Sequence, residues 1–301
     1  MSKTTAWIQA FRLRTLPLSI SGILVGSFIA YKNGFWDNGI FALAILTTLF
    51  LQILSNLAND LGDSQKGADN ESRVGPKRAV QSGVISAKEM QVGVVIFAIL
   101  AAATAIPLIF IGTSGMPLEV LWIYIGLGIA CIIAAITYTV GRKAYGYNGL
   151  GDLMVLIFFG FVSVLGVYSL FSKTFDILVF LPALTIGALS VAVLNLNNMR
   201  DQVNDAVVGK ITLVVQMGAK NAKVYHGILL LVSFLSLTSY ILINEIYISL
   251  LALLPYFILL KHYLLVRKNK DPKDLDPELK KVALATFFIA LLFSITLMIW
   301  S

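Results

Sequence analysis

Thiols, imidazoles and charged groups are all scarce in this 301-residue sequence, which contains one cysteine, two histidines and 13% charged residues. The lone Cys131 excludes an intrachain disulfide framework and a cysteine-based zinc site. Because it lies within an apolar run, we expect it to be a small buried side chain rather than a reactive thiol. The low charge excludes an ordinary soluble domain, in which about a quarter of the residues are charged. His226 and His262 lie outside every motif described below, and we assign them no role.

What the sequence has instead is apolar: 58% of its side chains are hydrophobic and its mean hydropathy is +0.85. The apolar residues form about nine runs of roughly 17 to 25 residues, each long enough to cross a bilayer as a helix. These uninterrupted runs exclude the alternating strands of a membrane barrel. The sequence therefore predicts an all-α, polytopic membrane protein that forms one transmembrane domain over residues 1–301. The expected membrane helices are 15–31, 39–57, 89–111, 118–140, 152–171, 176–199, 224–243, 246–266 and 282–300.

Lysine and arginine residues are distributed unequally over this map. Twenty-one of the 23 fall on one side of the membrane, and Lys32 and Lys173 fall on the other. Since Lys and Arg accumulate on the cytoplasmic side of membrane proteins, the N-terminus is predicted to be cytoplasmic and the C-terminus outside. We therefore expect a multi-pass protein of the inner, cytoplasmic membrane. Topology also explains the net charge of +7, so we expect no nucleic-acid partner.

Two groups of acidic and amide residues occur where apolar runs reach the cytoplasmic side. The first lies in residues 56–69 and the second in residues 195–205. If the helices continue into these segments, spacings of three, four and seven residues place each group on one helix face. The residues that share a face are Asn56, Asn59, Asp60 and Asp63 in the first group, and Asn197, Asp201 and Asp205 in the second.

The positions of the two groups indicate a weak internal repeat. Both groups end helices that run in the same direction, and these helices lie four helices apart in the chain. The chain is therefore predicted to contain two related four-helix halves, at about 12–140 and 150–266, followed by a terminal helix at 282–300. Each half then presents its own carboxylates to the same face of the membrane.

Carboxylates this close to hydrocarbon are costly unless a cation compensates their charge, because neighbouring carboxylates repel each other. Oxygen ligands without nearby histidine or cysteine suit Mg²⁺, which fills its remaining positions with water and phosphate oxygens. Two other interpretations stay open: the residues are loop residues and helix caps, or they serve a cation-coupled transporter, whose carboxylates more often lie near the bilayer midplane. The predicted metal ligands are Asp60, Asp63, Asp69, Asp201 and Asp205, with Asn56, Asn59, Asn197 and Asn198 as further oxygen donors.

Four blocks of residues, in this order along the chain, resemble the UbiA superfamily of intramembrane prenyltransferases, and most closely its menaquinone branch. Two positions depart from the pattern of the family: Gln216 stands where arginine is expected, and Lys77 where an apolar residue is usual. The blocks are RTLP at 14–17, NDxxDxxKGxD at 59–69 with RVGPxR at 73–78, YGYNGLGD at 145–152, and NNxRDxxxDxxxGKxTL at 197–213.

The resemblance implies a Mg²⁺-dependent enzyme that transfers a polyprenyl group from polyprenyl diphosphate to 1,4-dihydroxy-2-naphthoate. The reaction would release diphosphate and CO₂ and form demethylmenaquinone. It implies a central cavity that opens to the cytosol, with the polyprenyl chain held against apolar helix faces beside membrane lipid. The catalytic carboxylates would be Asp60, Asp63, Asp201 and Asp205. The nearest alternative is a prenyltransferase for 4-hydroxybenzoate, which keeps the carboxyl group of the acceptor, and a more distant one is a secondary transporter.

Basic and aromatic side chains complete the site that the resemblance implies. The candidates for contacts to diphosphate oxygens are Lys66, Arg73, Arg78, Arg200 and Lys210. The candidates for binding the acceptor or stabilising an allyl cation are Arg14, Tyr138, Tyr145 and Tyr147. The accumulation of positive charge on the cytoplasmic side would also explain the basic residues, and interfacial anchoring would also explain the tyrosines.

Overall fold

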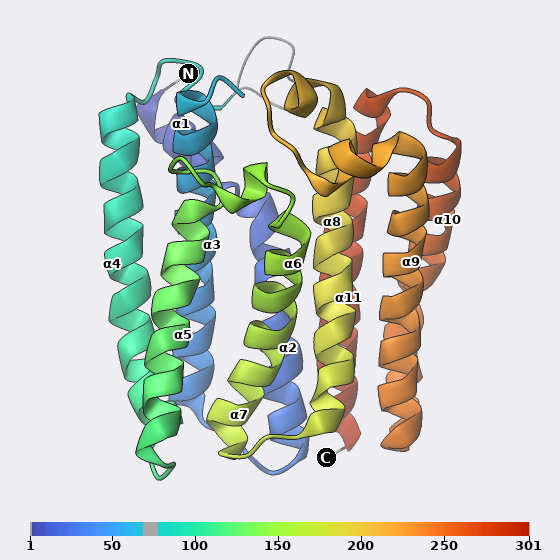
Figure 1. Ribbon diagram of the computed structural model, residues 1–301. Coiled ribbons are helices and arrows are strands. Elements are labelled where there is room, and N and C mark those ends of the chain that lie inside the picture. Colours follow the sequence, from blue (N-terminus) through green and yellow to red (C-terminus); the bar gives the residue numbers. More distant parts are fainter. Residues whose placement is uncertain (1, 69–77, 301) are drawn as a thin grey trace.

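The structure, a computed structural model, describes residues 2–68 and 78–300. The chain forms a bundle of long helices that run side by side, with the N-terminus at the upper end and the C-terminus at the lower end of Figure 1. No strand occurs within the described residues. The helical elements are α1 (Lys3–Phe11), η1 (Leu13–Thr15), α2 (Leu16–Lys32), α3 (Asn38–Gln65), α4 (Ala87–Gly112), α5 (Leu118–Thr137), η2 (Tyr145–Tyr147), α6 (Gly151–Val155), η3 (Leu156–Gly166), α7 (Val167–Ser172), η4 (Ile177–Val179), α8 (Phe180–Val207), α9 (Leu213–Ile243), η5 (Tyr247–Leu253), α10 (Tyr256–Lys268), η6 (Pro272–Leu275) and α11 (Asp276–Trp300).

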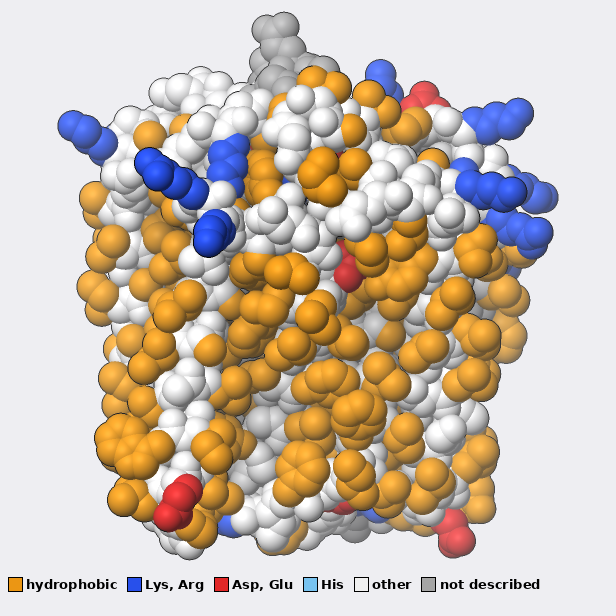
Figure 2. Space-filling model, viewed as in Figure 1, with side chains coloured by type: hydrophobic (Ala, Val, Ile, Leu, Met, Phe, Trp, Pro, Cys, Tyr) orange, Lys and Arg blue, Asp and Glu red, His pale blue; other side chains and the backbone are white. Residues whose placement is uncertain are grey.

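Nine helical segments within the described ranges are long and apolar enough to cross a membrane, which confirms the prediction of an all-α, polytopic fold. They contain 20 to 31 residues, and a rise of about 1.5 Å per residue lets each cross a hydrocarbon core of about 30 Å. In Figure 2 a broad apolar belt lies between the two ends of the bundle, and the Lys and Arg side chains gather mainly at the upper end. The chain is a multi-pass membrane protein.

The predicted boundaries were wrong at the two helix ends that carry the acidic groups. α3 continues to Gln65 rather than ending near residue 57, and α8 continues to Val207 rather than ending near residue 199. The prediction followed the apolar runs, whereas these last turns are polar. They stay helical inside the protein because their carboxylates face other elements: Asp60 and Asp205 are each 2% exposed.

Other elements also differ from the apolar runs. A short helix that was not predicted, α1, precedes the first membrane helix and begins at Ser2, whose side chain accepts the Thr5 N–H. The segment 152–171 contains the π-helix η3 in place of a continuous α-helix. The predicted helix 246–266 is divided into the 3-10 helix η5 and the α-helix α10. In addition, α5 ends at Thr137 rather than near 140, α9 begins at Leu213 rather than near 224, and α11 begins at Asp276 rather than near 282.

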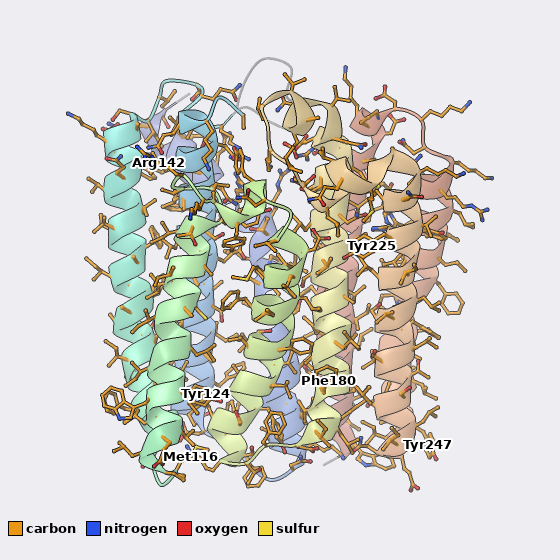
Figure 3. All side chains as sticks on the ribbon, in the orientation of Figure 1. Met116, Tyr124, Arg142, Phe180, Tyr225 and Tyr247 are labelled. Atoms are coloured by element: carbon orange, nitrogen blue, oxygen red, sulfur yellow. The ribbon has the colours of Figure 1, made fainter. Side chains whose placement is uncertain are left out.

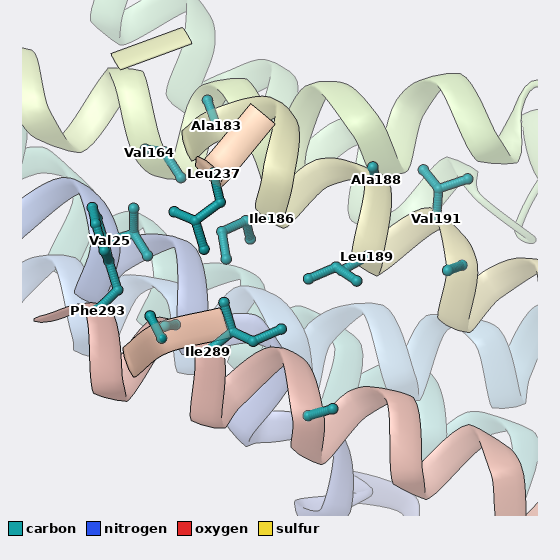
Figure 4. Close-up of a cluster of buried hydrophobic side chains, with 14 of the residues drawn as sticks. Val25, Val164, Ala183, Ile186, Ala188, Leu189, Val191, Leu237, Ile289 and Phe293 are labelled. Atoms are coloured by element: carbon teal, nitrogen blue, oxygen red, sulfur yellow. The ribbon is translucent and has the colours of Figure 1, made fainter. Parts of the chain in front are cut away.

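The core lies where α2, η3, α8, α9 and α11 meet (Figure 4). Lipid removes most of the hydrophobic drive for helix association, so close packing of small residues becomes decisive. The buried face of α8 carries such residues, including Ala183, Gly187 and Ala192. Ile186 and Phe293 are 1% and 0% exposed and fill the space between the helices. This packing holds α8, with its acidic end, against several helices at once.

The terminal helix α11 packs against α2 and α8 and so closes the bundle between its first and its sixth membrane segments. The helix ends with the two acidic groups lie at the same end of the bundle. The division of the chain into two related halves, at 12–140 and 150–266, stays a prediction.

Candidate active site

A cavity of about 1110 Å³ lies among α2, α3, α4, α5, η3 and α8, with the first turns of α11 at one side. Its long walls are apolar, whereas the end beside the last turns of α3 and α8 is polar and charged. Residues of both predicted acidic groups therefore border one cavity. The polar residues that line this end include Asn59, Asp60, Asp63, Arg78, Asn197, Arg200 and Lys210.

The end of α3 is fixed by the residues that follow α5. The Thr139 hydroxyl donates to the Ala58 carbonyl at 3.0 Å. A Cβ atom on Gly62 would lie 2.6 Å from Thr139, so glycine is what permits this close approach between the two segments. Between Ala58 and Gly62, Asp60 Oδ2 accepts the backbone N–H of Ala79 at 3.1 Å.

Both oxygens of Asp63 have partners. The Tyr147 hydroxyl donates to Oδ1 at 2.7 Å, and Arg78 Nη1 donates to Oδ2 at 2.5 Å. Arg78 also donates to the Asn59 carbonyl at 2.9 Å. The side chains of Arg78 and Asp63 are 12% and 5% exposed, so their opposite charges compensate each other where water is scarce.

Arg200 organises the second acidic group. Its Nε and Nη2 atoms donate to the two carboxylate oxygens of Asp201 at 2.9 and 2.7 Å, and Nη2 also donates to Asn197 Oδ1 at 2.8 Å. The remaining nitrogen, Nη1, donates to Asp276 at the start of α11 at 2.5 Å. Arg200 is 4% exposed, and this planar, bidentate contact fixes the orientation of Asp201.

A tight turn after α8 brings Lys210 back to the acidic group. Gly209 adopts a φ of +72°, a conformation that favours glycine, and the Lys210 N–H then donates to the Asp205 carbonyl at 2.8 Å. The ammonium nitrogen of Lys210 lies 3.4 Å from Asp205 Oδ1. The spacing of a glycine and a lysine after Asp205 therefore supplies a cation to this carboxylate.

Tyr147 joins the two acidic groups. Its hydroxyl contacts Asp63 of the first group, and its ring lies 4.0 Å from the Lys66 ammonium and 5.6 Å from that of Lys210. Burial raises the pKa of the Tyr147 phenol, and the negative charge of Asp63 raises it further, so the hydroxyl stays protonated and donates. Burial likewise lowers the pKa of the Lys66 ammonium, although Asp63 opposes that shift. A hydrogen bond of 3.0 Å from Asn204 to the Ala68 carbonyl also ties α8 to the residues after α3.

Each acidic group leaves one carboxylate oxygen available for a cation. Asp60 Oδ1 and Asp205 Oδ2 are buried without a hydrogen-bond partner in the described part of the chain, as is the amide oxygen Oδ1 of Asn198. A buried oxygen without a partner is costly. The described residues contain no closed metal site of three or more acidic, His or Cys side chains. Mg²⁺ needs one or two carboxylates when water and phosphate supply the rest, so this donor set fits Mg²⁺ together with a diphosphate.

The other predicted site residues divide into two sets. Arg14, Tyr138 and Tyr145 line the cavity. Asn56 also lines the cavity, but its amide nitrogen donates to the Phe11 carbonyl at 3.0 Å and its oxygen accepts from Gln52 at 3.2 Å. Its side chain therefore fixes the segment before α2. Asp69 and Arg73, and the departure at Lys77, lie outside the described residues.

One expectation about a single residue was wrong, and one departure from the family pattern lies away from the cavity. Cys131 was expected to be buried, but it is partly exposed and lines the cavity on α5. Gln216, the departure from the family pattern, is exposed, and its side-chain amide donates to the Ile211 carbonyl at 3.4 Å. Its side chain is not among those that line the cavity.

Three contributors to the cavity end and its surroundings were missed. Arg12 lines the cavity with a left-handed φ of 50° and acts electrostatically on Asp60, and its position two residues before the RTLP block was a usable signal. Asp276, the partner of Arg200, gave no such signal. The third contributor is a buried pair of histidines: the Nε2 atoms of His226 and His262 lie 2.8 Å apart, and His262 Nδ1 lies 2.5 Å from Glu278 at the start of α11.

This arrangement defines a class of polytopic helical membrane proteins with a cavity inside the bundle that is charged at one end and apolar along its length. Such a cavity suits a ligand with an anionic head and an apolar tail. Residues 19–292 match the model of the UbiA prenyltransferase family. The chain belongs to this family.

Two curated relatives are similar to the chain over nearly their whole length. A Haemophilus influenzae protein named 1,4-dihydroxy-2-naphthoate octaprenyltransferase is 43% identical, over 99% of this chain and 97% of that protein. The Escherichia coli protein of the same name is 40% identical, over 97% and 95%. The solved structure of a UbiA homologue from Archaeoglobus fulgidus bound to DMAPP and Mg²⁺ has a TM-score of 0.64, with 16% identity and 98% of both chains covered, so it shares the fold.

Proposed function

We propose that this protein transfers a polyprenyl group from polyprenyl diphosphate to 1,4-dihydroxy-2-naphthoate, with loss of diphosphate and CO₂, and so forms demethylmenaquinone. The observation that carries the proposal is an apolar cavity whose charged end is bordered by Asp60 and Asp63 of the first acidic group and by Asn197 of the second. The names of the relatives at 43% and 40% identity support the choice of acceptor. Prenyl transfer places a diphosphate and a long apolar chain in the same site, and this cavity matches both.

Asp60 and Asp205 would hold the cation through their unpartnered oxygens, Oδ1 and Oδ2. Mg²⁺ bound there supplies positive charge that stabilises the diphosphate as the carbon–oxygen bond breaks. Asp63 and Asp201 accept hydrogen bonds from Arg78 and Arg200, which hold both carboxylates in fixed orientations. In solved structures with the same fold, a prenyl diphosphate and Mg²⁺ are bound together.

Three cations at the charged end of the cavity would contact the diphosphate. Arg78, Arg200 and Lys210 all line the cavity, and each already pairs with a carboxylate of the acidic groups. A planar guanidinium can donate to a carboxylate and to a phosphate oxygen at the same time because it carries five N–H groups. The two arginines would therefore connect the acidic groups to the diphosphate.

Aromatic rings line the cavity next to this end and would face the allyl fragment. Tyr138 and Tyr145 pack edge to face with their centroids 5.3 Å apart. Burial raises the pKa of both phenols, and the carboxylates of Asp152, Asp63 and Asp205 also raise that of Tyr138. Neutral rings stabilise a developing cation through their π-faces without reacting with it, and the apolar walls keep water away.

The acceptor carboxylate would bind to arginine at the start of the first membrane segment. Arg12 and Arg14 both line the cavity at the charged end. The same end carries most Lys and Arg side chains in Figure 2, which supports a cytoplasmic position for the N-terminus and an outside position for the C-terminus. The acceptor, which is water-soluble, would then enter from the cytosol, and the prenyl donor would enter from the lipid of the cytoplasmic membrane.

The acceptor assignment is tested with carboxyl-labelled aromatic acids. Membranes containing the protein are supplied with prenyl diphosphate, Mg²⁺ and either labelled 1,4-dihydroxy-2-naphthoate or labelled 4-hydroxybenzoate. We expect prenylated product and release of labelled CO₂ from the naphthoate alone. Prenylated 4-hydroxybenzoate that retains its label would instead identify the other acceptor, and substrate flux across the membrane without covalent product would identify a transporter.

Cys131 provides a test of where the prenyl chain lies. It is the one cysteine of the chain and lines the cavity, so any reaction with a small membrane-permeable maleimide, however slow, reports on this position. We expect octaprenyl diphosphate with Mg²⁺, at about ten times its dissociation constant, to slow this modification about tenfold. Inorganic diphosphate with Mg²⁺ should leave the rate unchanged because it has no chain.

A matched control moves the thiol to the lipid-facing side of the same helix. Ile133 is 54% exposed, so a protein that combines Cys131→Ala with Ile133→Cys should react at a rate that the substrate does not change. Equal protection of both positions would contradict a chain bound inside the cavity.

A further inference from the structure

The first turns of α11 bring a lysine to the cavity that sequence analysis did not select. Asp276, Lys280 and Ala283 follow one another at intervals of four and three residues, so they share one face of the helix. All three line the cavity. Asp276 contacts Arg200 of the second acidic group. Lys280 lies one turn further along α11, which is about 6 Å deeper in the bundle on the side of the apolar walls.

Lys280 is a cavity cation without a partner. The three basic residues that would contact the diphosphate each pair with a carboxylate. The next residue, Lys281, pairs with Glu278, which faces α10. Asp276, one turn before Lys280, accepts from Arg200 instead. Within the part of the chain that the structure describes, neither a hydrogen bond nor an ion pair engages the Lys280 ammonium.

The accumulation of positive charge on one side of the membrane does not explain this position. Basic residues that only mark that side extend into water, as the nitrogen-tipped side chains do on both sides of the upper end of the bundle in Figure 3. A lysine in a cavity wall, nearer the hydrocarbon, is less well hydrated. An anionic group of a ligand would compensate its charge.

A second cation of this kind, Arg14, belongs to the helix that packs beside α11. Arg14 lies in η1, immediately before α2, and also lines the cavity without an ion-pair partner in the described residues. α2 and α11 pack against each other, and both begin at the charged end of the bundle. Arg14 and Lys280 therefore border the same end of the cavity from adjacent helices, where an anion would offset the repulsion between them.

We propose that Lys280, together with Arg14, binds the carboxylate of the aromatic acceptor. The inference rests on the proposed function, which assigns the paired cations to the diphosphate and leaves the unpaired ones for the second anionic group of the reaction. The acceptor ring must lie beside the first carbon of the prenyl chain, next to the diphosphate on the side of the apolar walls. Lys280 lies at this depth, because it is one turn beyond the contact between Asp276 and Arg200.

The test compares two molecules that differ only in the carboxylate. Purified protein in lipid nanodiscs receives saturating octaprenyl diphosphate and Mg²⁺. The KM for 1,4-dihydroxy-2-naphthoate is measured together with the competition constant of 1,4-dihydroxynaphthalene, which has no carboxylate. Lys280→Met should raise this KM about tenfold, the effect of one lost charge-assisted hydrogen bond. The competition constant, kcat and the KM for the donor should each change less than about twofold, because only binding of the carboxylate is lost.

Two further variants control the comparison. Lys280→Arg keeps a positive charge that binds carboxylates and should keep the KM within about twofold of that of the unaltered protein. Lys270, which is exposed between α10 and η6 and is not among the cavity-lining residues, provides a matched loss of charge at the same end of the bundle. Lys270→Met should leave both constants unchanged. Since Lys280 is exposed at the cavity wall, none of these substitutions should lower the unfolding temperature.

The outcomes separate this inference from the proposed function. An unchanged KM for the naphthoate in Lys280→Met overturns the role of Lys280. An equal rise of that KM and of the competition constant, or an equal effect of Lys270→Met, also overturns it, because neither is specific to a carboxylate bound at Lys280. A rise in the KM for the donor alone would assign Lys280 to the diphosphate instead. Absence of product from the unaltered protein with the naphthoate overturns the proposed function itself.

Discussion

Asp60→Asn is expected to lower the rate of prenyl transfer about 100-fold or more. The substitution keeps the size of the side chain and leaves an oxygen to accept the Ala79 N–H, which Asp60 accepts at 3.1 Å. It removes the negative charge and places a donor or a neutral oxygen where Oδ1 is unpartnered. Turnover by purified protein in nanodiscs, with saturating donor and acceptor, gives the measurement.

Asp205→Asn should give a comparable loss, because Asp205 contributes the unpartnered oxygen of the second acidic group. Asp60→Asn should unfold at or above the temperature of the unaltered protein, since the buried negative charge that it removes had an incomplete set of partners. Asp205→Asn takes the charge partner from the buried Lys210 and should unfold at a lower temperature. Loss of activity without loss of stability in Asp60→Asn would separate a role in the site from a role in folding.

Asp37→Asn is the matched control. Asp37 caps α3 at its other end by accepting the Ile40 N–H at 2.9 Å, and asparagine caps helices about as well as aspartate. This protein should retain full activity. Near-normal turnover in Asp60→Asn at normal abundance would show that the first acidic group does not hold a cation that the reaction needs.

The spacing of the acidic residues made their position predictable. Asp63 follows Asn59 by four residues and Asp60 by three, and Asn197, Asp201 and Asp205 in the second group are spaced by four. A helix that continues through such a segment places them on one face. The long apolar runs fixed the direction of every membrane helix, so the meeting of both groups at one end followed from counting helices.

The partners of these residues were not predictable in the same way. Arg200 binds Asp201, its neighbour in sequence, but also Asp276, which starts a helix 76 residues later. That contact depends on the packing of α11 against α8, and apolar runs do not determine which faces of two helices meet. The contact between His226 and His262 is of the same kind, because it joins α9 and α10.

The predicted helix boundaries were wrong for a related reason. Apolar runs indicate where a helix faces lipid, and a helix that leaves the lipid while still inside the protein loses that signal. The last turns of α3 and α8 are polar yet helical, and they carry the candidate ligands. The part of each helix that sequence hydropathy describes least well is therefore the part that forms the site.

Removal of divalent cations is expected to abolish both turnover and donor binding. Asp60 lines the charged end of the cavity, and Asp205 lies behind Lys210, which lines the same end. A diphosphate brought there without a cation meets their negative charge. In a thermal unfolding assay, Mg²⁺ with octaprenyl diphosphate at about 100 times its dissociation constant should add about 2.7 kcal/mol to the free energy of unfolding, or about 5 °C. Neither ligand alone should produce this shift.

Asp60→Asn should change the affinity for the donor in opposite directions without and with Mg²⁺, which provides an internal check of the coupling between cation and donor. One negative charge fewer reduces the repulsion of the diphosphate, so in EDTA this variant should bind octaprenyl diphosphate more tightly than the unaltered protein does. With Mg²⁺ present it should bind the donor more weakly, because one of the two unpartnered carboxylate oxygens is missing. If EDTA leaves the stabilisation by octaprenyl diphosphate unchanged in the unaltered protein, the carboxylates do not act through a metal. The chain would then have to hold the diphosphate with Arg78, Arg200 and Lys210 alone.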